Sequence, residues 1–188
     1  MSERNTVLRS LHDLGLVAWC GGSLMGAVGL NGAAEDEGTS ETLTVRISSA
    51  GWDRWAPVNA VAIAAHLIGG TGLLTANAAR VQQQQGVAAS TVAKTAMTGA
   101  ALAATAYARI LGKKIGKACS ADAEERAEAG QHPLPLDKAK RQLAAVQWAV
   151  PALTAGIVVL NALHGEQQRP LQQKTGMLQK MTGMDLHS

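Results

Sequence analysis

A long apolar run without a single charge is the feature that most constrains what this chain can fold into. From Leu14 to Ala34 the sequence reads LGLVAWCGGSLMGAVGLNGAA and contains no Asp, Glu, Lys or Arg. A helix needs about 20 such residues to cross the hydrocarbon core of a bilayer. We therefore expect a helix over residues 11–34 that crosses a membrane or lies in it.

Three further apolar segments follow the first. They are Pro57 to Ala79, Val87 to Ile110 and Leu143 to Leu163, and they predict helices over about 57–80 and 87–111 and a C-terminal helix from residue 143. The second segment is entered through Trp52, Arg54 and Trp55, a pattern typical of membrane interfaces. These segments predict an all-α, Ala- and Gly-rich membrane or membrane-associated protein with about four apolar helices.

The third segment is the weakest of the four because it contains Lys94. A lysine at the centre of a membrane helix costs about 2.5 to 3.5 kcal/mol. The segment inserts only if Lys94 reaches the interface or faces protein.

The composition favours helices that pack closely. The 188 residues are 47% hydrophobic and only 16% charged, whereas about 25% charged residues is usual in soluble domains. The chain has no Phe and one Tyr, so its apolar character comes from aliphatic and small residues. The net charge of +3 is too small to indicate a nucleic-acid-binding protein.

Small residues recur at helical spacing in two segments. Ala96, Ala100, Ala104 and Ala108 repeat every four positions, and Gly22 and Gly26 do the same. Such seams let helices approach closely, within one chain or between copies, and we expect a homo-oligomer. Ala-rich helices also show this spacing by chance.

The connections divide the chain into an apolar helical region (1–110), a charged connection (111–142) and a C-terminal helix with a tail (143–188). Residues 35–56 are predicted as an acidic loop, in which ETLTVRIS alternates as a short hairpin or an edge strand would. The polar tail after His164 places most of its Leu and Met residues on one helical face. It is predicted to be an amphipathic segment that docks a partner.

Three topologies are compatible with these segments. If all four span the membrane, the basic residues of the 111–142 connection face the cytoplasm and both termini lie outside. If the third segment stays on the cytoplasmic side, only the tail lies outside. If none spans, helices from several copies bury their apolar faces on one another.

Polar residues at helix ends form the candidate binding site. In an up-and-down bundle, His12, Asp13, Asn77, Arg80 and His164 lie at the same end. His12, Arg80 and His164 would then suit a quinone head group or a metal. The alternative is that Asp13, at the start of one helix, and His164, at the end of another, only complement the helix dipoles.

His66 is expected to lie away from these groups. It is thirteen residues from Ala79, about 20 Å along a helix at 1.5 Å per residue, so His12 and His66 are not expected to share one haem iron. An ionisable residue within lipid is a candidate functional group, and His66 is therefore a further cofactor-binding candidate. A neutral His bonded to a neighbouring helix is equally compatible with the sequence.

The C-terminal segment also contains candidate ligands for a copper site. Met177, Met181, Met184 and His187 supply thioether and imidazole ligands, which suit Cu(I). A Met and Leu stripe at this spacing is also typical of a packing face. No CxxC pair, HExxH, P-loop or GxSxG motif occurs, so we expect no enzyme and no resident metal.

Two resemblances to known proteins arise at these residues. LHDLGLVAWCGG, at residues 11–22, resembles the start of CopD-like four-helix membrane proteins. The whole chain resembles the membrane-linking stalk subunits of mycobacterial high-affinity uptake hydrogenases. That second likeness is carried by LHDLGLVAWCGGSLMGAVGLNGAA, the alanine seam from Ala96 to Ala108 and the tail.

The second resemblance implies an oligomeric scaffold that gives menaquinone an apolar path between the membrane and an electron-donating enzyme. We therefore expect a non-catalytic anchor subunit that links a larger respiratory oxidoreductase to the cell membrane. The alternative is a free-standing four-helix membrane protein that handles copper or another small solute.

Overall fold

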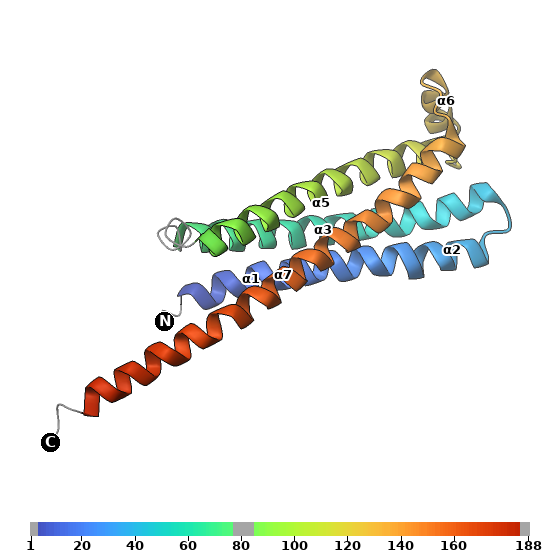
Figure 1. The fold of residues 1–188 in the computed structure, drawn as a ribbon. Helices are drawn as coiled ribbons and strands as arrows, with labels where there is room; N and C mark the ends of the chain where they lie inside the picture. The colour runs from blue at the N-terminus through green and yellow to red at the C-terminus, as the bar shows by residue number, and fades with distance from the viewer. Residues whose placement is uncertain (1–3, 77–84, 185–188) are drawn as a thin grey trace.

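The computed structural model describes the backbone of residues 4–76 and 85–184 and the side chains of residues 6–76 and 89–163. Every regular element in these residues is a helix (Figure 1), which confirms the all-α prediction. The elements are α1 (Arg4–Met25), a π-helix η1 (Gly26–Leu30), α2 (Asn31–Glu37), α3 (Glu41–Ala76), α5 (Gln85–Ala118), α6 (Ala123–Gln131) and α7 (Leu136–Met184).

The first three elements form one continuous helical rod that packs antiparallel on α3 (Figure 1). Gly22 and Gly26 face the indole rings of Trp55 and Trp52, and a Cβ atom at either glycine would overlap those rings. The Gly22 and Gly26 pair therefore faces α3, and the space it leaves is filled by two indole rings rather than by the α3 backbone. The π-helix begins at Gly26, and it includes the turn against which Trp52 packs.

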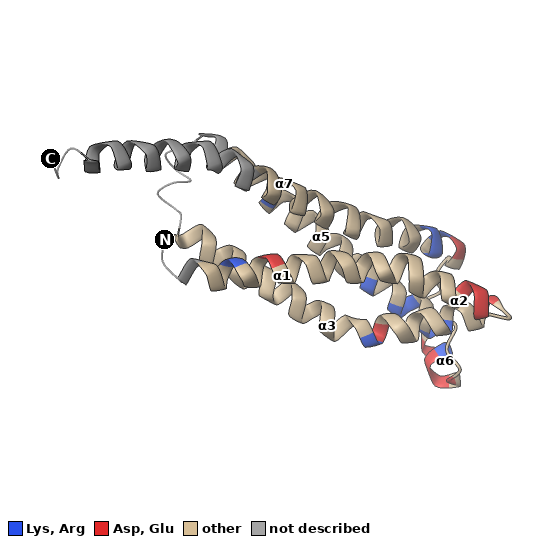
Figure 2. Cartoon of the chain, turned by 90° about the horizontal axis from the view of Figure 1, so that it is seen from below, with Lys and Arg blue, Asp and Glu red and all other residues tan. Residues whose placement is uncertain are grey.

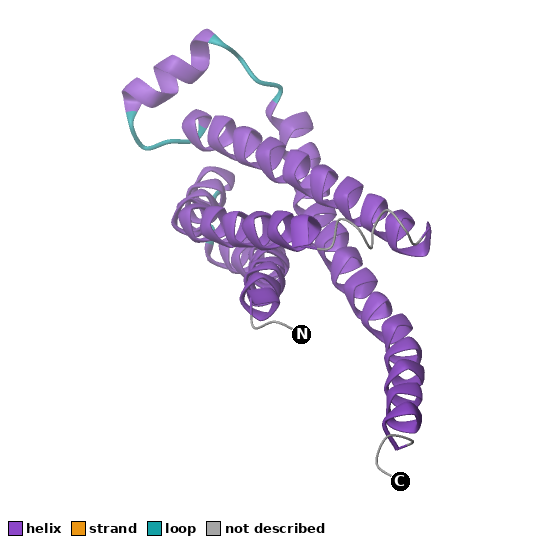
Figure 3. Ribbon diagram, turned by 90° about the vertical axis from the view of Figure 1, so that its left-hand side faces the viewer, coloured by secondary structure: helices purple, strands orange, loops and turns teal. Residues whose placement is uncertain are grey.

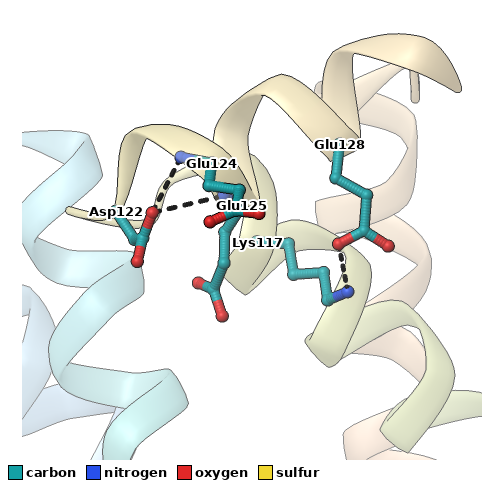
Figure 4. Close-up of polar contacts among 5 residues, drawn as sticks. All are labelled: Lys117, Asp122, Glu124, Glu125 and Glu128. Carbon is teal, nitrogen blue, oxygen red and sulfur yellow. Dashed lines mark hydrogen bonds and ion pairs between the residues drawn. The ribbon is translucent and has the colours of Figure 1, made fainter.

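The second hairpin consists of α5 and α7, joined through the short helix α6. Figure 3 shows α6 held between two loops beyond the ends of α5 and α7. Asp122 caps α6, because its carboxylate accepts the backbone N–H groups of Glu124 at 2.7 Å and Glu125 at 3.4 Å. Lys117 at the end of α5 donates to Glu128 at 2.8 Å (Figure 4). The cap fixes the first turn of α6, and the ion pair fixes this mostly exposed helix to the end of α5.

The two hairpins meet mainly through α1 and α7, and α3 and α5 contact each other less. Trp19 is fully buried in a cluster with Ala62, Ala101 and Val150, so all four long helices contribute to this core. A second cluster of Leu111, Ile115 and Ala139 lies nearer the α6 end, with Val45 packed against it.

Two predicted connections are wrong in their boundaries. The acidic loop expected at 35–56, with its hairpin or edge strand, is helical over Asn31–Glu37 and again from Glu41. Ser40 caps α3 by accepting the Leu43 N–H at 3.3 Å, and Val45 packs on α5 and α7. Capping and tertiary contacts therefore override the alternating pattern.

The charged connection expected at 111–142 is also mostly helical. The helix α5 continues to Ala118, α6 occupies Ala123–Gln131, and α7 begins at Leu136 rather than at residue 143. The extra turns are charged on one side only, since Leu111, Ile115 and Ala139 on the other side are buried. The helices therefore extend beyond their uncharged stretches.

Three helices are long and apolar enough to cross a membrane: Thr6–Glu37, Glu41–Ala76 and Leu136–Leu163. Only 22–28% of the residues in their most apolar stretches are buried inside the chain. The helix α5, which contains Lys94, is not among the three. The four predicted apolar segments are thus helical wherever the structure describes them, and three of them meet the length and hydropathy expected of membrane spans.

Candidate functional site

A stacked pair of histidines joins α1 to α3. The rings of His12 and His66 lie 4.1 Å apart between centroids, with an interplanar angle of 20°. His12 Nδ1 lies 3.0 Å from the His66 carbonyl oxygen, and His66 Nδ1 lies 3.0 Å from the His12 carbonyl oxygen. Because a carbonyl can only accept, both Nδ1 atoms carry a proton and donate.

The prediction that His66 lies about 20 Å from His12 is therefore wrong. The estimate placed the start of the first helix near Leu11, whereas α1 begins at Arg4. His12 is therefore two turns inside α1, level with His66. The rings face one another as a stack with both Nδ1 atoms engaged, so the pair leaves no room for a metal between the rings.

The same short sequence pattern, a histidine followed three residues later by a glycine, occurs on both helices of this contact. His12 is followed three residues later by Gly15 in HDLG, and His66 by Gly69 in HLIG. A Cβ atom at Gly15 would overlap the α3 backbone at Ala62 and His66, and one at Gly69 would overlap the α1 backbone at His12. Each glycine therefore lets the other helix approach closely enough for the reciprocal hydrogen bonds.

Trp19 connects the histidine pair to α5. Its indole meets the His66 ring edge to face, at 6.2 Å between centroids and an angle of 61°. Trp19 Nε1 donates to Thr105 Oγ1 at 3.2 Å, and that hydroxyl donates to the Ala101 carbonyl at 2.8 Å. The buried polar groups at the centre of the bundle are thus linked across α3, α1 and α5.

Charged and amide groups lie close to the histidine pair at the outer edge of the bundle. Lys94 on α5 interacts electrostatically with Asp13 and Arg9 on α1. Asp13 also lines a hollow of about 250 Å³ between α1 and α7, together with Asn161. Lys94 thus faces protein rather than lipid alone, as the sequence requires of an inserted third segment.

Within the described residues, no group of three or more His, Cys, Asp or Glu side chains is arranged to hold a metal ion. The stacked imidazoles and the Trp19 hydrogen bond are arranged to hold helices together. Cys20 contacts the Pro151 carbonyl at 3.8 Å, which places its thiol against the proline in α7.

A second feature, which the sequence did not predict, is a cavity of about 1070 Å³ between the two hairpins. It lies toward the α6 end and is lined by residues of α2, α3, α5 and α7. Two hydrogen bonds link the helices on one side of it: Trp52 Nε1 donates to Asn31 Oδ1 at 3.0 Å, and Asn31 Nδ2 donates to Gln147 at 2.9 Å. An Arg109–Asp53 ion pair joins α5 to α3.

This cavity arises because the two hairpins diverge where α3 faces α5. The cavity could have been anticipated from three side chains with polar groups, Trp52, Asp53 and Arg109. They lie at corresponding levels of the antiparallel helices α3 and α5. The sequence identified the tryptophan only as an interface residue. Its role as a bridge to Asn31 depends on a partner twenty-one residues away.

Several predicted site residues lie beyond what the structure describes in atomic detail. Asn77, Arg80 and His187 fall outside the described residues, and the side chain of His164 is not described. The polar mouth therefore stays a prediction, with only His12 and Asp13 placed. The copper ligands Met177, Met181 and Met184 belong to the part of α7 described as backbone only, so the copper site is also untested.

Comparison with known proteins adds no family to this description. No family model, curated protein or solved structure matches the chain. A functional proposal therefore has to rest on the geometry.

Proposed function

We propose that this chain is a non-catalytic anchor subunit that holds a larger respiratory oxidoreductase at a membrane. The observation that carries the proposal is the apolar surface that the chain leaves uncovered. Among the side chains that the structure describes, nineteen large hydrophobic ones are exposed, and they are distributed over α1, the π-helix, α3, α5 and α7. Leu14 and Val61 are 70% exposed and Val92 is 68% exposed. A surface of this kind requires lipid or other subunits to cover it.

The distribution of charge supports a membrane as the environment that covers most of this apolar surface. Figure 2 shows most of the charged residues gathered at the end where α2 and α6 lie. Residues 14–34, 55–76, 95–108 and 142–163 contain no Asp, Glu, Lys or Arg, and they belong to the four long helices. The shortest of these stretches, on α5, covers about 21 Å at 1.5 Å per residue, and Lys94 at its edge can extend toward the interface.

The direction of the helices supports four spans rather than three. Both α3 and α7 run from the α6 end toward the opposite end, and α5 runs the other way between them (Figure 1). If α3 and α7 cross a membrane in the same direction, α5 has to cross it in return. The electrostatic attraction between Lys94 and Asp13 offsets part of the cost of placing this helix in lipid.

Exposed small residues on α5 support self-association. Ala96 and Ala100 are exposed, and a Cβ at Gly99 would meet nothing within 4 Å. Ala104, by contrast, packs inside the chain against the Trp19 cluster. The seam predicted from the sequence is therefore divided, and we propose that its exposed half meets a second copy and that the apolar surface between copies gives menaquinone a path.

The partner-docking role falls to the end of α7. This helix is continuous from Leu136 to Met184, about 73 Å at 1.5 Å per residue, which is longer than the other helices of the bundle. Its last turns extend beyond the bundle in Figure 1. A single helix that leaves the membrane-embedded bundle is suited to carry a water-soluble enzyme.

The experiment that tests this proposal is a pull-down from native membranes after carbonate and high-salt washes. The expected result is that the chain resists both washes and that a redox enzyme is recovered with it under milder conditions. Release of the chain by carbonate would show that its helices do not span. Recovery of the chain alone from unwashed membranes would contradict the anchor role.

A further inference from the structure

The cavity between the two hairpins changes from charged to apolar along its length. Its rim, near α6, carries Arg46 from α3 and Lys113 from α5. Its inner end is lined mainly by apolar side chains such as Ile63 and Leu102, which pack against the Trp19 cluster. Asn59 and Trp55 also line it, and their Oδ1 and Nε1 atoms are buried without a hydrogen-bond partner among the described residues. A molecule that filled this space would need a charged group at one end and an apolar body at the other.

The depth of the cavity matches one leaflet of a bilayer. Lys113 and Leu102 are eleven residues apart on α5, about 16 Å at 1.5 Å per residue. Arg46 and Ile63 are seventeen residues apart on α3, about 25 Å on the same scale. Half of a 30 Å hydrocarbon core is about 15 Å, and the head-group layer adds several more. The cavity therefore runs from the level of the head groups to the middle of the proposed membrane.

Four charged side chains at the rim of the cavity form no close ion pair with any described residue of the bundle. Three other charged pairs near the cavity are internally satisfied: Arg109 with Asp53, Lys117 with Glu128 and Lys140 with Glu41. Among the residues that the structure describes, Arg46 and Lys113 have no ion-pair or hydrogen-bond partner. The side chain of Glu35, which also lines the rim, has no such partner among them either; Glu125 at the rim forms no close ion pair with a described residue, but it interacts electrostatically with Lys117. Cations and carboxylates are thus both available there.

We propose that this cavity is a specific site for one zwitterionic phospholipid. The phosphate lies against Arg46 and Lys113, the ammonium group lies toward Glu35 and Glu125, and an acyl chain enters between the hairpins as far as Leu102. An uncharged isoprenoid quinone would fit the apolar part but would offer no opposite charge to the four rim side chains. The site rests on the membrane location proposed above, and it is independent of the partner enzyme.

The volume is compatible with this occupant. Sites for drug-sized ligands are about 300 to 1,000 Å³, and the cavity, at about 1070 Å³, is slightly larger than this range. A lipid in this position would cover the apolar walls of α3 and α5 where the two hairpins diverge. It would thus complete the contact between the hairpins that the chain alone leaves open.

The test measures phospholipid retained by the full-length chain, extracted from membranes in mild detergent and washed by detergent exchange. Phosphorus analysis gives the lipid bound per chain, and mass spectrometry gives its class. Refilling with phosphatidylethanolamine or phosphatidylglycerol from mixed micelles measures the preference. We expect about one phosphatidylethanolamine per chain and at least a fivefold weaker retention of phosphatidylglycerol.

Two matched pairs of variants locate the site. The double change R46Q/K113Q removes the rim cations, and R54Q/K114Q removes the same charge from exposed residues of α3 and α5 outside the cavity. Ala106→Trp places a large side chain in the cavity, and Ala103→Trp makes the same change at an exposed α5 position outside it. We expect R46Q/K113Q and A106W to lower retention about tenfold, which is 1.4 kcal/mol, and the two controls to retain the lipid.

The outcomes separate this proposal from the anchor role. Equal loss in R46Q/K113Q and R54Q/K114Q, retention of quinone in place of phospholipid, or no retained lipid from a carbonate-resistant chain would overturn the lipid site and leave the membrane anchor standing. A chain released by carbonate would overturn both.

Discussion

Replacing Gly69 by Ala tests the physical reason for the contact between α1 and α3. A Cβ atom at this position would lie 2.8 Å from His12 Cα, whereas ordinary contact begins at 3.4 Å. It would also overlap the His12 backbone nitrogen and the Leu8 carbonyl. These are backbone atoms of another helix, so the clash can be relieved only if the two helices separate.

The expected loss of stability follows from three terms. Overpacking at a closely packed contact costs about 1 to 3 kcal/mol. Separation of the helices also weakens the two His–carbonyl hydrogen bonds, and interhelical hydrogen bonds in membranes average about 0.6 kcal/mol each. Ala gains back about 1 kcal/mol over Gly in a helix. The net destabilisation of Gly69→Ala is therefore about 1 to 3 kcal/mol.

The matched control is Gly21→Ala on α1. A Cβ at Gly21 would meet nothing within 4 Å, so only the gain in helix propensity of up to about 1 kcal/mol applies. Thermal unfolding of the full chain in detergent, followed by circular dichroism, should rank Gly21→Ala at or above the unmodified chain and Gly69→Ala below it. If Gly69→Ala is as stable as Gly21→Ala, the close-approach argument is refuted.

Three further predictions follow from the contacts at other positions. Trp19→Phe removes the hydrogen bond to Thr105 and should destabilise the chain by about 1 kcal/mol; a double-mutant cycle with Thr105→Val should show non-additivity, and strict additivity would contradict the bond. The Lys117–Glu128 hydrogen bond lowers the pKa of Glu128 below 4.5 and raises the pKa of Lys117 above 10.5. Its contribution is therefore fully present between these values, lost as pH falls through the lowered Glu128 pKa, and lost again above the raised Lys117 pKa. The protection of α6 against hydrogen exchange, taken relative to the intrinsic rate at each pH, should decrease at low pH, and Glu128→Gln should weaken this dependence; a variant whose pH profile matches that of the unmodified chain would argue against the ion pair. Removal of residues 165–188 should release the partner enzyme without dispersing the oligomer, as measured by co-purification and by native mass spectrometry; assembly that survives the truncation would show that another surface docks the partner.

The length of the uncharged stretches made the helices predictable. A run such as Leu14 to Ala34 is too long for a strand and carries few turn signals, so an all-α fold followed from the sequence. The glycines opposite Trp52 and Trp55 were also recognisable, because their spacing of four places both on one helix face. Local propensity was less informative at residues 41–56, where alternation suited a strand and Ser40 together with tertiary packing selected a helix.

The sequence by itself determined that the chain consists of long apolar helices with charge concentrated in the connections, because composition and periodicity act locally. Only the tertiary structure decided which turns of those helices face one another. Pairing depends on where each helix begins and on how far it slides along its neighbour; α1 begins at Arg4, seven residues before the expected start at Leu11, and His12 packs level with His66. The cavity between the hairpins also depends on tertiary packing, since α3 packs mainly on α1 and α5 mainly on α7, and α3 and α5 contact each other little.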